Sequence, residues 1–344
     1  MKAIVFRRHG GPEVLEYADV PDPSVGPGEI LVRVKACALN RLDLWIRQGI
    51  PAYHIQLPHI SGCDVAGVVE RAGPDVTHVA VGDSVVLAPG VSCGQCDWCR
   101  AGDDNLCASY GIRGAKTDGG YAELTIAAAR DALLLPPGLS FEEAAAFPLV
   151  FLTAWHMLVT RAKLQMGETV LVHAAGSGVG HAAIQIAKHV GARVYTTVGS
   201  DAKIPKAKAL GADEVINYQR EDFEERIGTL TQKRGVSVVF EHIGPQTWEK
   251  SLRVLAKGGR LVTCGATSGP SVPLDLRYVF SRQLTILGSM MGTRAELEQV
   301  TQLIGQRKLK PVVDTVFPLR EARAAQERML NRDVFGKLVL RPEP

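Results

Sequence analysis

The chain has 344 residues, of which 46% are hydrophobic and 22% charged. This length exceeds the size at which a single hydrophobic core usually stops growing, so we expect two domains. The formal net charge is only +3, with Lys and Arg interspersed among Asp and Glu, which gives a nucleic-acid-binding function no support.

The N-terminal residues run directly into an apolar strand pattern that contains Arg7 and Arg8, without the features of a signal peptide. The longest uncharged stretch, Ala144 to Thr160, contains Pro148 and His156. It falls short of the roughly 20 apolar residues that a membrane span needs, so we expect buried connecting structure there. These patterns predict a cytoplasmic protein that does not bind membranes.

From residue 1 to about 130, short β-rich runs are broken by Gly and Pro, as in Glu29 to Ala38, Val65 to Glu70 and Ser84 to Ala88. This spacing predicts an antiparallel, barrel-like domain. The tail from about residue 295 has two helical patterns, a segment Pro311 to Leu319 between them and a final strand Gly336 to Leu340. We expect the tail to pack on the N-terminal domain.

The middle of the chain alternates strands with helices. Thr169 to Ala175 predicts a strand, and the following residues carry an apolar helical face from Val179 to Val190. The alternation indicates a doubly wound parallel sheet of six strands, an α/β fold. The other five predicted strands are Arg193 to Val198, Glu214 to Tyr218, Val236 to Glu241, Arg260 to Cys264 and Leu284 to Gly288.

Four of the seven cysteines lie in one short polar segment with the spacing C-x2-C-x2-C-x7-C: Cys93, Cys96, Cys99 and Cys107. Thiolates so close in sequence can surround a tetrahedral Zn²⁺ at about 2.3 Å and fill all four of its positions. A closed site cannot activate a substrate. We therefore expect one structural zinc, which would fix a segment that has no core of its own.

A glycine-rich turn follows the strand that ends near His173, and it includes Ser177, Gly178, Val179 and Gly180. Small residues allow the backbone to approach a pyrophosphate, which the positive end of the following helix attracts. Its position between a strand and a helix makes the turn specific for a dinucleotide.

The end of the second strand of this series suggests which dinucleotide is bound. No carboxylate stands at Val198, where an NAD-binding protein would grip the ribose, and Ser200, Lys203 and Lys206 follow. We therefore expect NADP(H) to be favoured over NAD(H). Asp201 opposes this interpretation, and the lysines could equally form a solvated helix face.

These features together resemble the medium-chain dehydrogenase/reductase superfamily over essentially the whole chain. The resemblance implies a GroES-like, partly open β-barrel catalytic domain at 1–150 and 295–344, with a zinc lobe at about 90–110, and a Rossmann domain at 151–294. It also implies a homodimer or homotetramer. The matching segments are Pro27 to Glu29, Gly62 to Val69, the four-cysteine segment, Gly119 to Glu123, Gly176 to Gly180, Lys208 to Asp213 and Gly336-Lys337.

Zinc alcohol dehydrogenases of this superfamily also hold a catalytic zinc. Matching their motifs to this chain puts Asn40, Cys63 and Leu149 at the three ligand positions. Leucine has no donor atom and asparagine is a poor zinc ligand, so no high-affinity catalytic zinc is expected. The segment from Ala36 to Asp43 instead resembles the zinc-free quinone oxidoreductase branch.

Other histidines and cysteines leave alternatives open. Cys37, Cys63, Asp64 and His59 could form an atypical metal site, or the two cysteines could be small buried hydrophobic residues. Cys264, in a predicted strand, is expected in the core. Either His173 or His242 could approach the cofactor or be a buried structural residue.

We therefore predict hydride transfer from NADPH to a quinone or to a polarised C=C or C=O bond of a small molecule. The site is expected in a cleft between the domains, with Asn40 as donor to the developing oxyanion and Asp43 as an orienting group or the partner of a structural ion pair. The alternatives are a zinc-dependent alcohol dehydrogenase with an atypical metal site and a non-catalytic NADP(H)-binding protein. The expected catalytic residues are Asn40, Asp43, Cys63 and Asp64, with Tyr53 beside them; further cofactor contacts are expected at Tyr218, Gly265, Gly288 and Lys337.

Overall fold

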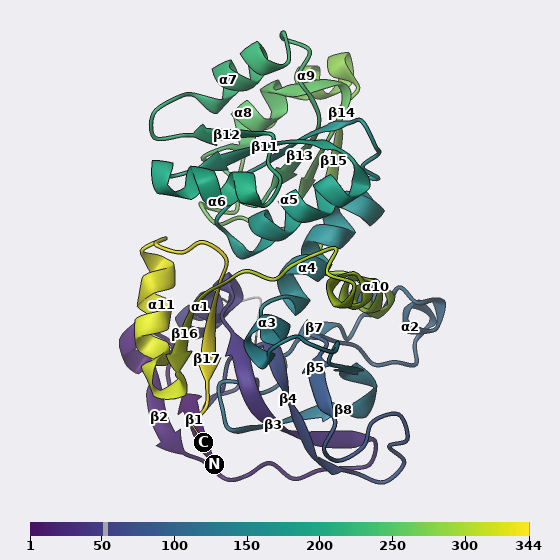
Figure 1. Ribbon diagram of the computed structural model, residues 1–344, viewed down its shortest axis with the longest axis vertical. Coiled ribbons are helices and arrows are strands. Elements are labelled where there is room, and N and C mark those ends of the chain that lie inside the picture. The colour runs from purple at the N-terminus through teal and green to yellow at the C-terminus, as the bar shows by residue number, and fades with distance from the viewer. Residues whose placement is uncertain (51–53, 344) are drawn as a thin grey trace. The chain divides into compact units, whose positions relative to one another are not determined.

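The computed structural model describes residues 1–50 and 54–343, so the predicted site residue Tyr53 lies outside the described residues (Figure 1). The chain forms two compact units. The barrel unit comprises Met1–Leu149, Thr293–Arg307 and Pro311–Pro344, and the parallel-sheet unit comprises Val150–Gly292 and Lys308–Lys310. None of the helices in the described ranges has the length and hydrophobicity that crossing a bilayer requires.

The barrel unit is built around one sheet in the order β16-β17-β3-β4-β5-β9, with β8 paired to β3. Its long strand β3 buries most of its side chains against a core that includes Val32, Val65 and Leu338. β3 is antiparallel to β4 and β8, as the sequence predicts. The strands are β3 (Glu29–Ala38), β4 (Asp64–Ala72), β5 (Ser84–Leu87), β8 (Leu124–Ala128), β9 (Ala132–Leu134), β16 (Val313–Pro318) and β17 (Lys337–Arg341).

The C-terminal tail enters this sheet. β17 pairs antiparallel with β3 through Val339 opposite Ala38, while β16 and β17 run parallel to each other. The helix α11 lies beside these two strands (Figure 1). The remaining elements of the unit are β1 (Lys2–Val5), β2 (Glu16–Asp19), β6 (Gly90–Val91), β7 (Gly111–Ile112), α1 (Arg41–Gln48), α2 (Asp97–Ala101), α3 (Phe141–Ala145), α10 (Arg294–Gly305) and α11 (Ala322–Leu330).

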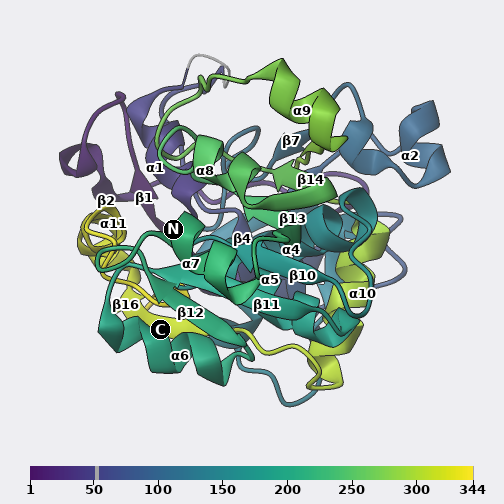
Figure 2. The ribbon, with the colours of Figure 1, turned by 90° about the horizontal axis from the view of Figure 1, so that it is seen from above.

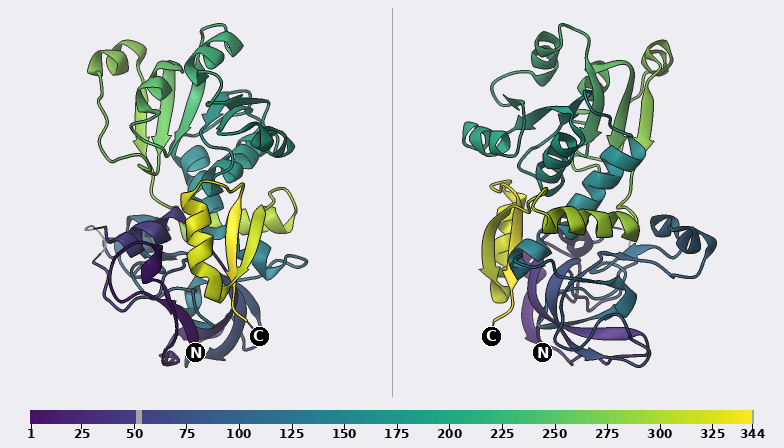
Figure 3. Two further views of the ribbon diagram at one scale, coloured as in Figure 1. Left: turned by 90° about the vertical axis from the view of Figure 1, so that its left-hand side faces the viewer. Right: turned by 45° about the vertical axis from the view of Figure 1, so that its right-hand side comes forward.

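The parallel-sheet unit has the strand order β12-β11-β10-β13-β14-β15, and every pair in it is parallel. The chain order reverses between β10 and β13, which confirms the doubly wound sheet. Helices cover both faces of this sheet (Figure 3). The strands are β10 (Thr169–Val172), β11 (Arg193–Val198), β12 (Glu214–Asn217), β13 (Val236–Glu241), β14 (Leu255–Thr263) and β15 (Thr285–Gly288); the helices are α5 (Gly178–Val190), α6 (Ile204–Ala209), α7 (Phe223–Leu230), α8 (Trp248–Arg253) and α9 (Leu276–Arg282).

Two predicted strands of the parallel sheet differ from the structure by three residues or more at one end. β10 ends at Val172 rather than Ala175, because Ala174 adopts a left-handed backbone with a φ of 53° that breaks the extended chain. β14 begins at Leu255 rather than Arg260, since Leu255 pairs with Val236 ahead of a break in register. Cys264 consequently lies just beyond a strand and is only partly buried, so its placement in the core was wrong.

The uncharged stretch Ala144 to Thr160 is mostly buried, as predicted. It contains the end of α3, the helix α4 (Pro148–Trp155) and the start of a π-helical turn, η4 (His156–Arg161). The chain passes from the barrel unit to the parallel-sheet unit within α4, after Leu149.

Candidate functional site

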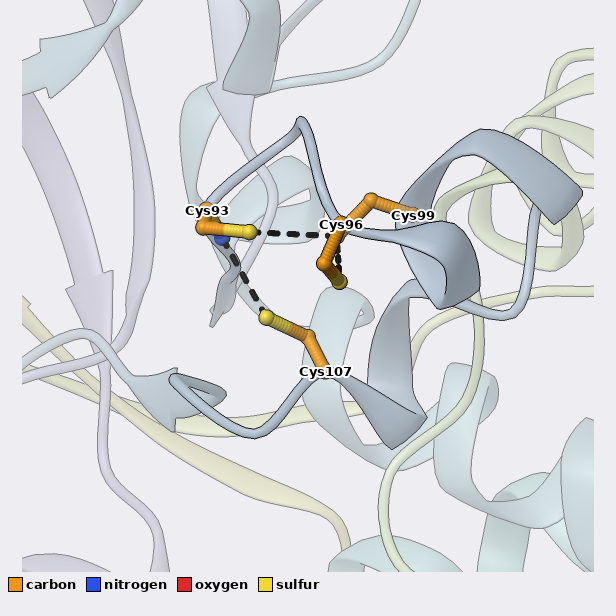
Figure 4. Close-up of side chains that lie close together, drawn as sticks. All are labelled: Cys93, Cys96, Cys99 and Cys107. Carbon is orange, nitrogen blue, oxygen red and sulfur yellow. Dashed lines mark hydrogen bonds between the residues drawn. The ribbon is translucent and has the colours of Figure 1, made fainter.

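The four cysteines of the predicted zinc lobe converge in the structure (Figure 4). Cys93 follows β6, Cys96 and Cys99 flank the start of α2, and Cys107 follows a short 3-10 turn. Their four sulfur atoms all lie within 4.8 Å of one another. The Sγ of Cys99 is 3.5 Å from that of Cys96 and 3.9 Å from that of Cys93.

These distances suit a tetrahedral zinc. Four sulfurs at about 2.3 Å from a central ion would be about 3.8 Å apart, close to the separations observed. The backbone N–H groups of Gln95 and Cys96 lower the pKa of the Cys93 thiol to about 6, whereas burial and the neighbouring thiols raise the pKa of Cys96 to about 11. The residues of the lobe therefore fit a structural zinc with no position left for substrate.

The lobe is tied to a helix of its own unit. Its helix α2 lies at the periphery of the barrel unit in two perpendicular views (Figures 1 and 2). The carboxylate of Asp104 accepts a hydrogen bond of 2.9 Å from the backbone N–H of Arg294, at the start of α10. A fixed lobe would therefore also fix the N-terminus of α10.

A second cluster brings together residues from three distant parts of the barrel unit. Asn40 precedes α1, Cys63 and Asp64 stand where β4 begins, and Lys337 is the first residue of β17. All four are buried, Cys63 and Asp64 completely. The pairing of β3 with both β4 and β17 brings these segments together.

Hydrogen bonds join the members of this cluster. The amide nitrogen Nδ2 of Asn40 donates to Oδ2 of Asp64 at 2.8 Å and to Sγ of Cys63 at 3.2 Å. The ammonium of Lys337 donates to Oδ1 of Asn40 at 2.6 Å and to Oδ2 of Asp64 at 3.1 Å. This network fixes the orientation of the Asn40 amide, because turning it over would place its N–H groups against the ammonium.

Asp43 contacts the backbone of Asn40 rather than its side-chain amide. Its Oδ2 accepts hydrogen bonds from the backbone N–H of Asn40 at 2.7 Å and from the hydroxyl of Tyr121 at 2.9 Å. Its Oδ1 is buried without a partner in the described part of the chain. Burial raises the pKa of Asp43 to about 6. Among the described residues Asp43 and Arg41 form no ion pair, and the bonds to Asn40 and Tyr121 suit an orienting role.

The three positions that correspond to catalytic zinc ligands do not fit a metal. Asn40 and Cys63 hydrogen-bond to each other, and burial raises the pKa of the Cys63 thiol well above its ordinary value, which keeps it protonated. Leu149 offers only its backbone N–H, which donates to Oδ1 of Asp64 at 2.8 Å. The three positions Asn40, Cys63 and Leu149 therefore lack the anionic donors that zinc needs.

The atypical metal site considered from the sequence is also not formed. Within residues 1–50 and 54–343, close groups of three or more His, Cys, Asp or Glu donors occur only at the zinc lobe. His59 points elsewhere, with Nε2 2.9 Å from the carbonyl oxygen of Gly114 and Nδ1 3.4 Å from Asp118. Cys37 is completely buried, as a small hydrophobic residue would be.

The glycine-rich turn of the parallel-sheet unit has the form that a dinucleotide requires. The hydroxyl of Ser177 accepts a hydrogen bond from the backbone N–H of Gly180 at 2.9 Å and caps α5, which begins at Gly178. A Cβ atom at Gly180 would lie 2.2 Å from the carbonyl oxygen of Ala174. Only glycine therefore permits this close approach, and the cradle fits a pyrophosphate at the N-terminus of a 13-residue helix.

The end of β11 carries a feature that the sequence interpretation missed. Asp201, the residue that opposed an NADP preference, accepts a hydrogen bond of 2.6 Å from Asn217 and forms an ion pair of 2.8 Å with Arg220. Its charge is therefore balanced by an exposed arginine. Ser200 immediately precedes Asp201, and Lys203 ends the same short turn.

The other predicted cofactor residues lie at the ends of strands of the same sheet. A Cβ atom at Gly199, just after β11, would lie 2.6 Å from the hydroxyl of Tyr218, which follows β12. Gly265 follows β14, and Gly288 is the last residue of β15. In a parallel sheet these carboxyl ends share one edge, where ligands of doubly wound folds bind. Lys337 is different, because it belongs to the barrel unit.

The two histidines at this edge are part of a buried network. His173 hydrogen-bonds through Nε2 to the hydroxyl of Ser251 at 2.9 Å, and that hydroxyl donates to Glu241 at 3.0 Å. The Nε2 of His242 lies 3.0 Å from the carbonyl oxygen of His173. Burial lowers the pKa of His173 to about 4. Both histidines thus have structural partners.

Comparison with known proteins identifies the family. A model described as "Alcohol dehydrogenase GroES-like domain" matches residues 26–137, and one described as "Zinc-binding dehydrogenase" matches residues 178–306. An alcohol dehydrogenase from Geobacillus stearothermophilus is 35% identical, with 99% of each chain covered. This chain belongs to the medium-chain dehydrogenase/reductase superfamily.

Other members of the superfamily agree with this assignment. A quinone oxidoreductase from Pseudomonas aeruginosa is also 35% identical over 99% of each chain. A solved structure described as an NAD-dependent alcohol dehydrogenase is 48% identical, with a TM-score of 0.96 and 99% of each chain covered. This medium-chain dehydrogenase/reductase is therefore an oxidoreductase with a GroES-like domain and a Rossmann domain, as the sequence predicts.

Three contacts of the site were not foreseen from the sequence of this oxidoreductase: Tyr121 with Asp43, Arg220 with Asp201, and Lys337 with Asn40. The residues Tyr121 and Arg220 lie close in sequence to features that were recognised. Tyr121 lies in the family segment Gly119 to Glu123, and Arg220 comes shortly after the strand end at Asn217. Lys337 lies 297 residues from Asn40 along the chain, and only the pairing of β17 with β3 brings them together.

Proposed function

We propose that this protein reduces a quinone, or an activated C=C or C=O bond of another small molecule, by hydride transfer from NAD(P)H, with a structural zinc and without a catalytic zinc. The observation that carries the proposal is the buried network of Asn40, Cys63, Asp64 and Lys337. It fills the position of a catalytic metal with an amide, a thiol and an ion pair. Removing hydride from an unactivated alcohol would need a group that lowers the alcohol pKa, and outside the zinc lobe the described residues form no group of three or more His, Cys, Asp or Glu donors that could hold a metal for this purpose.

The chain's own residues would position and polarise the substrate. An electron-poor acceptor takes hydride readily if the negative charge that develops on its oxygen is stabilised. Asn40 is the proposed donor to that oxygen, and because its Nδ2 donates to Asp64 and Cys63, it would exchange one of these hydrogen bonds for one to the substrate. Asp43 and Tyr121 hold the start of α1 and so position Asn40 within the network.

We assign the bound zinc to Cys93, Cys96, Cys99 and Cys107, on the basis of their sulfur separations. We assign the nicotinamide dinucleotide to the carboxyl edge of the parallel sheet, where Ser177 to Gly180 would hold the pyrophosphate. The cofactor supplies the hydride. In this proposal residues 1–150 and 295–344 are the catalytic domain and residues 151–294 the dinucleotide-binding domain.

We propose NADP(H) as the preferred cofactor. Arg220 balances the carboxylate of Asp201, so that carboxylate repels the 2′-phosphate of NADP(H) less. Arg220 and Lys203 are also two positive charges near the end of β11. The likeness to a solved structure described as an NAD-dependent alcohol dehydrogenase, which is 48% identical, supports NAD(H) instead. Comparing kcat/KM for NADPH and NADH decides between them. Arg220→Ala should lower kcat/KM for NADPH about tenfold and leave NADH unaffected, while Arg277→Ala, in α9, is the matched control.

The second candidate function is a zinc-dependent alcohol dehydrogenase, which the two relatives described as alcohol dehydrogenases favour. A third is an NADP(H)-binding protein without catalytic activity. The deciding experiment is a steady-state screen of NADPH and NADH with a quinone, an enone and a set of alcohols, together with the zinc content. Reduction of a quinone or enone with one zinc per chain supports our proposal. Alcohol oxidation with a second, chelatable zinc would overturn it, and cofactor binding without turnover would favour the third candidate.

We also propose a homodimer, or a tetramer built from two dimers, in the cytoplasm. The strand β15 is at the edge of the parallel sheet and pairs only with β14 among the described strands. Leu276 and Phe280 on the preceding helix α9 are 67% and 70% exposed. An unpaired strand edge next to exposed apolar side chains suits pairing with a second copy. Sedimentation of the wild type and of Phe280→Glu tests this, because the variant should shift toward the monomer.

A further inference from the structure

We propose that Glu241 is a positioning residue for the nicotinamide half of the cofactor: its carboxylate, at the end of β13, holds residues 243–247 in the shape that receives this half. We call residues 243–247 the β13 loop. The inference rests on the proposed dinucleotide site and concerns the parallel-sheet unit alone. Glu241 would act through the β13 loop rather than by touching the cofactor itself.

The Glu241 carboxylate is bound by the chain that follows it. The side chain is completely buried. Its Oε1 accepts hydrogen bonds from the backbone N–H groups of Ile243 at 2.6 Å and Gly244 at 3.1 Å. Its Oε2 accepts from the hydroxyls of Thr247 at 2.8 Å and Ser251 at 3.0 Å. Since hydrogen bonds to a carboxylate are stronger than those to a neutral acceptor, one side chain fixes both ends of the β13 loop.

Hydrogen bonds also balance the charge of Glu241. Burial favours the protonated acid, but the hydrogen bonds that the carboxylate accepts lower the pKa of Glu241 below its ordinary value. Its ionic neighbour among the described residues is His173, whose Nε2 is 3.7 Å from Oε2. Burial lowers the pKa of His173 to about 4, so this histidine is uncharged at neutral pH. A completely buried carboxylate without a lysine or arginine partner is rare, and here the β13 loop supplies most of its donors.

The same carboxylate is connected to the neighbouring strand β10. The strand order reverses between β10 and β13, and doubly wound folds bind a dinucleotide across this point of reversal. The hydroxyl of Ser251, which donates to Glu241, accepts a hydrogen bond of 2.9 Å from Nε2 of His173, just after β10. The carbonyl oxygen of His173 accepts in turn from Nε2 of His242 at 3.0 Å. Glu241 is therefore linked to both strands that border the expected cofactor site.

The β13 loop in turn holds the residues that follow β14. The carbonyl oxygen of Ile243 accepts hydrogen bonds of 2.7 Å from both the backbone N–H and the hydroxyl of Ser268. Gly244 has a left-handed φ of 93°, and a Cβ atom there would lie 2.9 Å from the carbonyl oxygen of Gly269. The two loops are thus packed closely together. A change at Glu241 would consequently affect the chain after both β13 and β14.

These two loops lie where the nicotinamide half of the cofactor is expected. A doubly wound sheet consists of two halves, each of which binds one mononucleotide. In the proposed site, the turn from Ser177 to Gly180 holds the pyrophosphate and the end of β11 holds the adenosine ribose. The strands β10, β11 and β12 then form the adenosine half, which leaves β13, β14 and β15 for the nicotinamide nucleotide. Glu241 should therefore influence the binding of that nucleotide alone.

Four variants test this role. Glu241→Met removes the acceptor of all four hydrogen bonds at nearly constant side-chain size. Glu241→Gln is the conservative variant, because its amide oxygen can still accept from Ile243 and Gly244 while its nitrogen donates to the two hydroxyls. Thr247→Val keeps the carboxylate and releases one end of the β13 loop. Glu214→Met is the matched control, since Glu214 is the first residue of β12, at the amino end of a strand of the same sheet.

The measurement compares each whole dinucleotide with its adenosine half. Titration calorimetry gives the Kd for NADPH and 2′,5′-ADP, and for NADH and ADP, and the dinucleotide that the wild type binds more tightly is used for the variants. We expect Glu241→Met to raise the Kd of this dinucleotide at least about tenfold, because two N–H groups of the β13 loop lose their acceptor. The Kd of the adenosine half should stay within about twofold of the wild-type value, since its contacts lie on the other half of the sheet.

The other variants have graded expectations. Glu241→Gln should restore most of the affinity lost in Glu241→Met, because the hydrogen bonds of the β13 loop can form again. Thr247→Val should show a smaller loss of the same kind, limited to the whole dinucleotide. Glu214→Met should bind both ligands as the wild type does. Thermal unfolding of each variant establishes which of them are folded, and Thr247→Val decides if Glu241→Met does not fold.

The outcomes separate this inference from the function on which it rests. If the wild type binds neither dinucleotide, the proposed function fails and the inference fails with it. If the wild type binds one of them and folded Glu241→Met binds it equally well, only the role of Glu241 is wrong. An equal loss of affinity for the dinucleotide and for its adenosine half would show that Glu241 supports the sheet as a whole, which would also overturn the inference.

Discussion

The amide of Asn40 donates a hydrogen bond from Nδ2 to the Sγ of Cys63 across 3.2 Å. These are two of the three positions at which zinc alcohol dehydrogenases of the superfamily would hold their catalytic metal. In this chain they contact each other directly. The thiol is completely buried, and burial and the nearby carboxylate of Asp64 raise its pKa well above the ordinary value, so the thiol stays protonated at neutral pH.

The zinc lobe yields the first prediction. Cys107→Ser should reduce the zinc content from about one per chain to nearly none, because three thiolates of an exposed lobe hold zinc much less tightly than four. Metal analysis after dialysis measures this. Limited proteolysis should at the same time cut the variant between residues 90 and 110. Cys264→Ser, outside the lobe, is the control and should retain the full zinc content; equal zinc in both variants would refute the assignment.

The glycine-rich turn before α5 yields the second prediction. Gly180→Ala should weaken NADPH binding at least about tenfold, because its Cβ would meet the Ala174 carbonyl oxygen at 2.2 Å and push the turn away from the pyrophosphate. Gly228→Ala is the matched control within a helix of the same unit, where an added Cβ meets nothing within 4 Å. It should stabilise the protein by about 0.5–1 kcal/mol and leave the Kd unchanged. Wild-type affinity in Gly180→Ala would argue against a dinucleotide at this turn.

Acid should destabilise the parallel-sheet unit through His173. Burial lowers its pKa from 6.5 to about 4, so the unfolded chain binds a proton more readily than the folded one. The associated stability is fully present above pH 6.5 and is lost as the pH falls toward 4, by roughly 2–4 kcal/mol. Hydrogen exchange of peptides covering β10, corrected for the intrinsic rate, measures the loss. His173→Gln should lack this part of the pH dependence, and an unchanged slope in that variant would point to another group.

Asp43 should make the stability of the barrel unit depend on pH in the opposite direction. Burial raises its pKa from 3.8 to about 6, so its contribution to stability is fully present below pH 3.8 and is lost as the pH rises through 6. Relative to Asp43→Asn, the wild type should lose about 2–3 kcal/mol between pH 4 and 7. Unfolding by urea at several pH values, with exchange of peptides covering α1, tests this. A difference that stays constant with pH would mean that Asp43 titrates normally.

The sequence predicted the fold well because its signals are local. The strand that ends before Ser177, the helix that follows and the glycine between them lie within one short segment, and the cysteines of the zinc lobe are neighbours in the chain. The ends of β10 and β14 were harder to predict, since a single left-handed residue at Ala174 and a break in register after Val236 determine them.

The candidate catalytic cluster was only partly predictable. Asn40, Cys63 and Asp64 could be chosen from family motifs, but their partner Lys337 comes from the last strand of the chain. No pattern of spacing shows that a lysine 273 residues beyond Asp64 will lie 3.1 Å from its carboxylate. The hydrogen bonds of the Asn40 amide were unpredictable for the same reason, because the donors of an amide can be assigned only when all of its neighbours are known.

The disagreement between the cluster and zinc predicts a gain of function in metal binding. Replacing Asn40 and Leu149 by Cys, and Cys63 by His, supplies the missing anionic and imidazole donors. This triple variant should still bind only one metal per chain, because the ammonium of Lys337 occupies the Asp64 carboxylate and would repel a metal cation beside it. Adding Lys337→Met removes that cation, and the quadruple variant should bind a second equivalent, seen as thiolate-to-metal absorption with Co²⁺. A second metal in the triple variant would show that the ammonium does not oppose the ion.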